Sequence, residues 1–194
     1  MVSRSLISSS GEDAKMCSQC WIPDLEYKSP YEDFSVYEDR IYEIFKNDFI
    51  AHNPTFQGLP VKVRRYAEEI DGKWAGFFHI TSVEDHKTGE RDVDLRRCER
   101  IRFPSPSISY SFNCPTCNYD TCEKPLIWKE RQYGKNRIHI LLKSEKYIIV
   151  LEPRPKAKMP YCMLITAYYL DRENSFKREI RRYETAAKEG RVIQ

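Results

Sequence analysis

Apolar residues recur at helical spacing in two parts of the chain, with charged residues between them. The first series runs from Phe34 to Phe49 and stops before Asn53-Pro54, which predicts a helix over 34–50. The second series lies near the C-terminus and predicts a closing helix over 173–188, rich in basic residues.

Short apolar runs predict β-strands between these two helices. Val61 and Val63 alternate with polar residues after a turn, and the continuous run KWAGFFHITS follows over 73–82. The Asp71-Gly72 turn signal between them predicts a hairpin, which would place His79 at the end of a buried strand. Three further strands are predicted in the C-terminal third, over 137–143, 146–153 and 161–170.

The remaining segments carry weaker patterns. Residues 92–103 fit a short helix or an extended segment, and the following Pro104 breaks whatever precedes it. Residues 107–135 read as a loop-like insert with three cysteines. The order of elements predicts an α+β fold with a largely antiparallel sheet. We expect an irregular, flexible segment over 1–30 and a single domain over 31–190, which suits a chain of 194 residues.

Composition and charge limit the classes of protein that the sequence fits. Apolar residues make up 41% of the chain, enough for a core, and no apolar run reaches the roughly 20 residues of a membrane helix. The N-terminus shows no apolar secretory segment, so we expect a cytoplasmic protein that needs no membrane. The net charge is only +3, but basic clusters and an acidic stretch over 24–43 would let one side face an anion.

Two of the cysteine pairs have the spacing of metal ligands. Cys17 and Cys20, and Cys114 and Cys117, each form a Cys-x-x-Cys motif, so together they could hold one structural zinc ion. Four thiolates would leave no open position for a catalytic metal. Cys122 is an alternative fourth ligand, Cys98 and Cys162 fit the core, and the competing interpretation is a set of reduced, unpaired thiols.

His79 is the candidate for proton transfer. It ends an apolar run, hydroxyls follow at Thr81 and Ser82, and a basic block with Arg96, Arg97 and Arg100 comes soon after. An imidazole can take a proton from a ribose 2′-OH, and arginines can hold the phosphate, so this set is the equipment of a metal-independent ribonuclease. The competing interpretation is an inert, hydrogen-bonded core histidine.

Several segments resemble small prophage and toxin–antitoxin-associated proteins of the barnase–EndoU–colicin–RelE (BECR) ribonuclease superfamily. The resemblance covers residues 34–184 in order, and the segments that carry it are PTFQGLPVKVRRYAEEIDGKWAGFFHITS, DVDLRRCERIRFP, RIHILLKSEKYIIVLEPR and MLITAYYLDRENSFKREIRRYE. It implies an N-terminal helix packed on an antiparallel sheet of four to five strands. It also implies an endoribonuclease toxin that cleaves RNA and leaves a 2′,3′-cyclic phosphate, with an antitoxin or immunity protein as a partner.

The resemblance assigns roles to particular residues. It carries over His79 as general acid or base, Arg97 and Arg100 as phosphate ligands, and Thr166 as support for the oxyanion; for Thr166 an ordinary strand role is the alternative. Glu99 joins this catalytic set, and a solvated ion-pair network is the alternative for Arg97, Glu99 and Arg100. Ser105 stands where the family commonly has an arginine. We expect further contacts with RNA from Arg64, Arg65, Arg96, Tyr168, Arg178 and Arg182.

Three other classes of protein compete with the ribonuclease. A zinc deaminase needs His-x-Glu and Pro-Cys-x-x-Cys, but Thr81 stands two residues after His79 and Asn113 precedes Cys114, so we exclude it. A zinc-stabilised nucleic-acid-binding module would need no histidine. A phage accessory protein would use its tyrosine and arginine surfaces to bind a protein.

Overall fold

The computed structural model describes residues 21–65, 72–85 and 87–194. The elements in this part of the chain, in order, are α1 (Phe34–Lys46), the π-helical turn η1 (Asn47–Ala51), β1 (Thr55–Phe56), β2 (Leu59–Lys62), α2 (Ala75–Thr81), β3 (Ser82–Glu84), β4 (Arg91–Val93), α3 (Leu95–Cys98), α4 (Pro104–Ser109), β5 (Leu126–Gln132), β6 (Lys135–Leu142), β7 (Tyr147–Arg154), β8 (Tyr161–Tyr169) and α5 (Glu173–Lys188). No helix in these residues combines the length and apolarity that a bilayer crossing requires.

The centre of the fold is a six-stranded sheet with the order β1-β2-β8-β7-β6-β5. Its strands pair antiparallel except β2 and β8, which run parallel with Val61 opposite Cys162. The predicted α+β class with a largely antiparallel sheet is therefore confirmed, with more strands than expected. A small second sheet joins β3 to β4.

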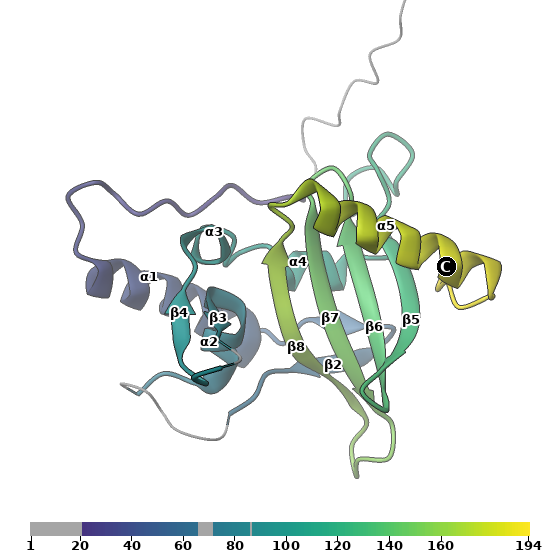
Figure 1. Cartoon of the computed structure of the whole chain (residues 1–194), viewed down its shortest axis with the longest axis horizontal. Coiled ribbons are helices and arrows are strands. Elements are labelled where there is room, and N and C mark those ends of the chain that lie inside the picture. The colour runs from purple at the N-terminus through teal and green to yellow at the C-terminus, as the bar shows by residue number, and fades with distance from the viewer. Residues whose placement is uncertain (1–20, 66–71, 86) are drawn as a thin grey trace, which may run out of the picture.

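Both faces of the large sheet are covered, as Figure 1 shows. Helix α5 crosses one face, where Trp128, Leu141 and Ile148 form a small core with Ala186. The main core occupies the other side, and there the aromatic side chains of α1 pack against Phe77 of α2. Burial on both faces explains why β6 and β7 are almost continuously apolar rather than alternating.

The elements with strong periodicity appear where the sequence predicts them. The first helical series forms α1 and η1, with Tyr37, Ile41 and Phe45 completely buried. The second forms α5 over the predicted residues. The three strands of the C-terminal third are β6, β7 and β8, each within two residues of its expected bounds.

The predicted strand over 73–82 is wrong, because Ala75–Thr81 forms helix α2. The buried side chains in this run are Phe77, Ile80 and Thr81, which is the three-and-four spacing of one helix face. Gly76 makes the close approach possible: its N–H donates to the carbonyl of Arg64 at 3.0 Å, and a Cβ there would lie 2.9 Å from the Cβ of Val63. The continuous apolar run thus covers a packed helix.

The predicted hairpin is wrong as well. Strand β2 pairs with β1 across a turn at Gln57-Gly58 and with β8, so it has no partner in the 73–82 segment. Asp71 of the expected turn lies outside the described residues.

The expected insert over 107–135 is shorter than predicted, because its ends belong to α4 and β5. Pro104 ends one segment as expected but also begins α4, where a missing N–H costs nothing.

The segment before α1 contains no helix or strand over residues 21–32, in agreement with the sequence. It nevertheless packs on the domain, because Trp21, Ile22 and Leu25 contact the main core. The backbone N–H of Glu26 also donates to the carbonyl of Glu99 at 2.8 Å. The part of this segment that carries Cys17 and Cys20 lies outside the described residues.

Candidate functional site

Helix α2 presents His79 on its half-buried face, close to two arginines. The Nε2 atom of His79 lies 3.5 Å from an Nη atom of Arg64, which follows β2. Burial, together with the positive charges of Arg91 and Arg64, lowers the pKa of His79 to about 4. The imidazole is therefore neutral at pH 7 and able to accept a proton.

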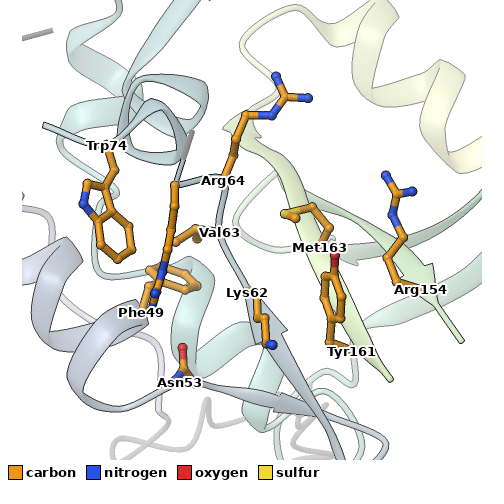
Figure 2. Close-up of a pocket in the computed structure, with 10 residues that line it drawn as sticks. Phe49, Asn53, Lys62, Val63, Arg64, Trp74, Arg154, Tyr161 and Met163 are labelled. Carbon is orange, nitrogen blue, oxygen red and sulfur yellow. The ribbon is translucent and has the colours of Figure 1, made fainter. Parts of the chain in front are cut away.

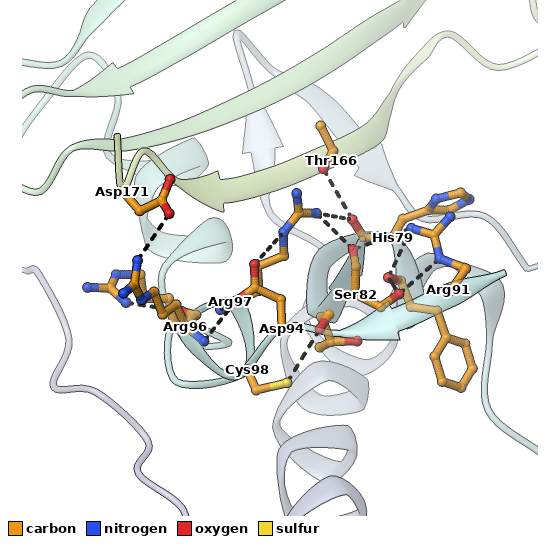
Figure 3. Close-up of polar contacts among 12 residues, drawn as sticks. His79, Ser82, Arg91, Asp94, Arg96, Arg97, Cys98, Thr166 and Asp171 are labelled. Carbon is orange, nitrogen blue, oxygen red and sulfur yellow. Dashed lines mark hydrogen bonds and ion pairs between the residues drawn. The ribbon is translucent and has the colours of Figure 1, made fainter. Parts of the chain in front are cut away.

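The structure brings His79, Arg97 and Thr166 together, but through the backbone of His79 rather than its ring (Figure 3). The hydroxyl of Thr166 donates to the carbonyl oxygen of His79 at 3.1 Å, and Arg97 donates to the same oxygen at 3.5 Å. Arg97 makes its shorter bond, 2.9 Å, to the carbonyl of Ser82. Both side chains thus hold the last turn of α2, whose carbonyls have no partner within the helix.

The hydroxyls at Thr81 and Ser82 serve the same helix end. Thr81 donates to the carbonyl of Phe77 at 2.9 Å, and Ser82 donates to the carbonyl of Phe78 at 2.6 Å. These bonds run back along the chain by four residues, so both hydroxyls belong to the helix terminus. Both hydroxyls donate their protons to helix carbonyls, and neither contacts the imidazole of His79 in these bonds.

Arg91 on β4 is the residue that sequence reasoning missed. Its guanidinium donates to the hydroxyl of Ser82 at 2.9 Å and pairs with Glu84 at 2.8 Å. It also donates to the carbonyl of Phe78 at 3.3 Å, which places its charge beside α2 and lowers the pKa of His79. No local pattern marks Arg91, because it follows a polar loop and only the β3–β4 pairing turns it towards the helix.

The basic block on and after α3 packs against the tyrosines of β8. The guanidinium carbon of Arg97 lies 4.9 Å from the ring centroid of Tyr168, and that of Arg100 lies 4.1 Å from the ring centroid of Tyr169. Such cation–π contacts each contribute about 0.5–2 kcal/mol, depending on desolvation. Burial lowers the pKa of Arg97, whose guanidinium is largely enclosed.

The other members of the block form ion pairs. Arg96 pairs with Asp171 at 3.1 Å, and both side chains are about half exposed, as in the solvated ion-pair network that the sequence offered as the alternative to a catalytic role. Glu99 lies 3.8 Å from Arg100, which also donates to the carbonyl of Arg96 at 3.0 Å. The Arg100 and Glu99 side chains are more enclosed, at 14% and 25% exposure.

The remaining predicted RNA contacts are divided between two regions. The guanidinium of Arg65 lies over the ring of Trp74, next to Arg64. Arg178 and Arg182 belong to α5, where Arg182 pairs with Glu130 at 2.6 Å and with Glu179 at 2.9 Å. In the described part of the chain no contact joins either of these α5 arginines to His79.

Three cysteines in the loop between α4 and β5 form a cluster. The Sγ atoms of Cys114, Cys117 and Cys122 all lie within 4.8 Å of one another, close enough to hold one metal ion. Cys117 and Cys122 are 3.1 Å apart, and the hydrogen bond between them lowers the pKa of Cys117 to about 5. The three thiols could therefore act as ligands of one metal ion. Cys98 and Cys162 are buried in the core as predicted.

No protein-family model, curated protein or solved structure matches this chain. The relation to BECR ribonucleases therefore stays an expectation from the sequence.

Proposed function

We propose that this protein is a metal-independent endoribonuclease in which His79 acts as the general base. The observation that carries the proposal is the placement of one half-buried, neutral imidazole beside Arg64, with Arg91 on the same helix end. Arg64 supplies the positive charge that attracts a phosphodiester, Arg91 adds to it although it also pairs with Glu84, and the imidazole supplies the proton acceptor.

The reaction needs no nucleophile from the protein. His79 takes the proton of a ribose 2′-OH, the 2′-oxygen bonds to phosphorus, and the bond from phosphorus to the 5′-oxygen breaks. Water protonates the departing 5′-oxygen, which leaves a 2′,3′-cyclic phosphate and a 5′-hydroxyl. A bound phosphate offsets the charges of Arg64 and Arg91, so it raises the pKa of His79 from about 4 towards the operating pH.

Arg97 and Thr166 act in this proposal as positioning residues. Both donate to the carbonyl oxygen of His79 and thereby fix the end of α2 that carries the imidazole. Arg100 and Glu99 stabilise the adjoining α3 segment. The phosphate contacts that the sequence assigned to Arg97 and Arg100 pass to Arg64 and Arg91, whose charges face His79.

The zinc site braces the fold in this proposal and takes no part in the chemistry. Cys114, Cys117 and Cys122 supply three thiolates, and Cys17 or Cys20 supplies the fourth. Such a site joins the N-terminal segment to the loop before β5. Reduced thiols of this kind suit the cytoplasm, where we place an RNA-cleaving toxin held in check by an antitoxin or immunity protein.

A second function remains in competition, a zinc-stabilised nucleic-acid-binding protein without cleavage. It is favoured by one observation: Thr166 and Arg97 bond to the backbone of His79 and are not aimed at a scissile phosphate. The same cationic surface would then bind RNA, and His79 would be a structural residue.

The deciding experiment compares wild type with His79→Ala and His79→Gln on single-stranded RNA, in a buffer without added divalent metal ions and without a chelator, which would remove a structural zinc. We expect the wild type to generate 2′,3′-cyclic phosphate ends and both variants to lose most of that activity, since removing a general base typically costs about 10²–10⁴-fold. Induced expression should arrest growth only with wild type. Circular dichroism checks folding of the variants. Equal cleavage by all three proteins would reject His79 as the general base, and no cleavage by wild type would reject the enzyme.

A further inference from the structure

A basic and aromatic pocket lies beside the candidate site. It has a volume of about 610 Å³, in the range of roughly 300–1,000 Å³ that suits small ligands. Its walls come from β2 and the residues after it, from the start of α2, and from the facing ends of β7 and β8. Figure 2 shows Trp74 and Tyr161 on opposite sides of Lys62 and Arg64.

Four cations line the pocket in the described part of the chain. Its lining includes Lys62, Arg64, Arg65 and Arg154 and no carboxylate. Within the residues that the structure describes, Lys62, Arg64 and Arg65 make no ion pair with a carboxylate. Arg154 does pair, but its partner Glu152 is shared with a second arginine, Arg137. Among the described residues, the lining therefore carries more positive than negative charge, which favours an anionic ligand.

Two of these cations lie over aromatic rings. The Nζ atom of Lys62 is 4.8 Å from the ring centroid of Tyr161, and the guanidinium carbon of Arg65 is 4.8 Å from that of Trp74. Both rings are half-buried, and the long side chains above them are exposed. Since an exposed lysine or arginine can swing aside, each ring face is available to a flat ligand, and the displaced cation remains nearby for a phosphate.

One side chain connects the pocket to the imidazole. Arg64 lines the pocket and also reaches to within 3.5 Å of the Nε2 atom of His79. A phosphate held by Arg64 would therefore lie between the two sites.

We propose that this pocket binds a nucleotide of a single-stranded RNA, next to the phosphodiester that faces His79. The base stacks on Trp74 or Tyr161, and the adjoining phosphates contact Lys62 and Arg64. The position of the pocket relative to a scissile bond rests on the proposed function, but the binding of a nucleotide does not. An acidic peptide would satisfy the cations and leave the two rings without a role.

The test measures the affinity of the full-length chain for a short fluorescent single-stranded RNA by anisotropy. We expect Trp74→Leu and Tyr161→Leu to weaken binding by about 5- to 150-fold, the range that corresponds to the loss of one base stacked on an aromatic side chain. The plot of log K against log salt concentration has a negative slope. Lys62→Gln should make that slope less steep by about 0.7, the amount for one phosphate contact to a single strand. Lys188→Gln, at the exposed end of α5, is the matched control and should leave affinity and slope unchanged.

The outcomes separate this proposal from the enzyme. Binding that depends on Trp74, Tyr161 and Lys62 but leads to no cleavage supports the pocket and rejects the ribonuclease. Cleavage and binding that ignore all three substitutions overturn the pocket and leave the ribonuclease standing. If polyglutamate displaces the RNA equally well from wild type and from Tyr161→Leu, the pocket proposal would also be overturned.

Because Lys62 is exposed, the salt slope remains informative even if Trp74→Leu does not fold. A DNA strand that binds but is not cleaved supports stacking, since cleavage requires the 2′-OH.

Discussion

The hydroxyl of Thr166 on β8 donates a 3.1 Å hydrogen bond to the carbonyl oxygen of His79 on α2. This bond joins the sheet to the end of a short helix, and Arg97 approaches the same oxygen. The two donors fix the carbonyl without touching the imidazole, so the ring keeps its nitrogens for Arg64 or a substrate.

Replacing Thr166 with valine removes the hydroxyl and keeps the side-chain shape. We expect Thr166→Val to lower the free energy of unfolding by about 0.5–1.5 kcal/mol in urea titrations, because Arg97 partly satisfies the oxygen that is left. Thr166→Ser retains the donor and should stay closer to wild type. If the enzyme proposal holds, Thr166→Val also lowers kcat more than its unfolded fraction explains. Equal stability of all three proteins would contradict the role of this bond.

Neutralising Arg91 should change the titration of His79. Burial is the main cause of the low pKa of His79, and the charge of Arg91 is the next, so Arg91→Gln raises this pKa above about 4 while burial keeps it below 6.5. An NMR titration that follows the His79 ring proton measures the change directly. The control is Arg96→Gln, which removes an exposed arginine that pairs with Asp171. An unchanged His79 titration in Arg91→Gln would show that the charge of Arg91 does not act on the imidazole.

His139 makes stability depend on pH. It is 2% exposed, stacks on Trp128 at 4.8 Å, and neither ring nitrogen has a hydrogen-bond partner in the described residues. Burial, aided by the charge of Arg182, lowers its pKa to about 4. Above pH 6.5 the ring is neutral in both states, so its protonation costs nothing; as the pH falls from 6.5 to 4, only the unfolded chain binds the proton, and stability is lost.

We therefore expect His139→Phe to remove part of the acid sensitivity. The loss attributable to His139 between pH 6.5 and 4 is on the order of 3 kcal/mol, from about 1.36 kcal/mol per unit of pKa. A phenyl ring can keep the stack on Trp128 and buries no unpartnered nitrogen, so the variant should also be more stable at pH 7. Urea titrations across this range measure both effects, and His79→Gln separates the contribution of the second buried imidazole. Parallel pH profiles for wild type and His139→Phe would contradict this account.

The cluster of Cys114, Cys117 and Cys122 predicts that the purified protein contains zinc. Protein purified under reducing conditions should contain one zinc per chain, and Cys114→Ser, Cys117→Ser and Cys122→Ser should each lose most of it, because a tetrahedral site needs all its ligands. Cys17→Ser and Cys20→Ser identify the fourth ligand, since only one of them should release zinc. Cys162→Ser, in the core, is the control. Zinc that survives all three substitutions in the cluster would reject the site.

The candidate site was predictable in its residue types and only partly in its arrangement. Local spacing alone indicated Cys114 and Cys117, whereas the proximity of Cys122 depends on how the loop between α4 and β5 turns back. Arg97 and Thr166 were expected near His79 and are near it, but their bonds go to its backbone carbonyl. Whether Arg97 and Thr166 face the ring or the carbonyl of His79 depends on the backbone around His79. That backbone was predicted as a strand and is helix α2.

Local pattern was enough to predict α1, α5 and the three consecutive strands β6, β7 and β8, because each shows its own periodicity or uninterrupted apolar length over many residues. The helical state of the run around His79, in contrast, depends on its contacts with the rest of the fold. Seven residues with an apolar majority fit a strand or a helix equally well, and here the backbone of Arg64 against Gly76 selects the helix. The site and the adjoining pocket follow from that contact, since both need Arg64 beside α2.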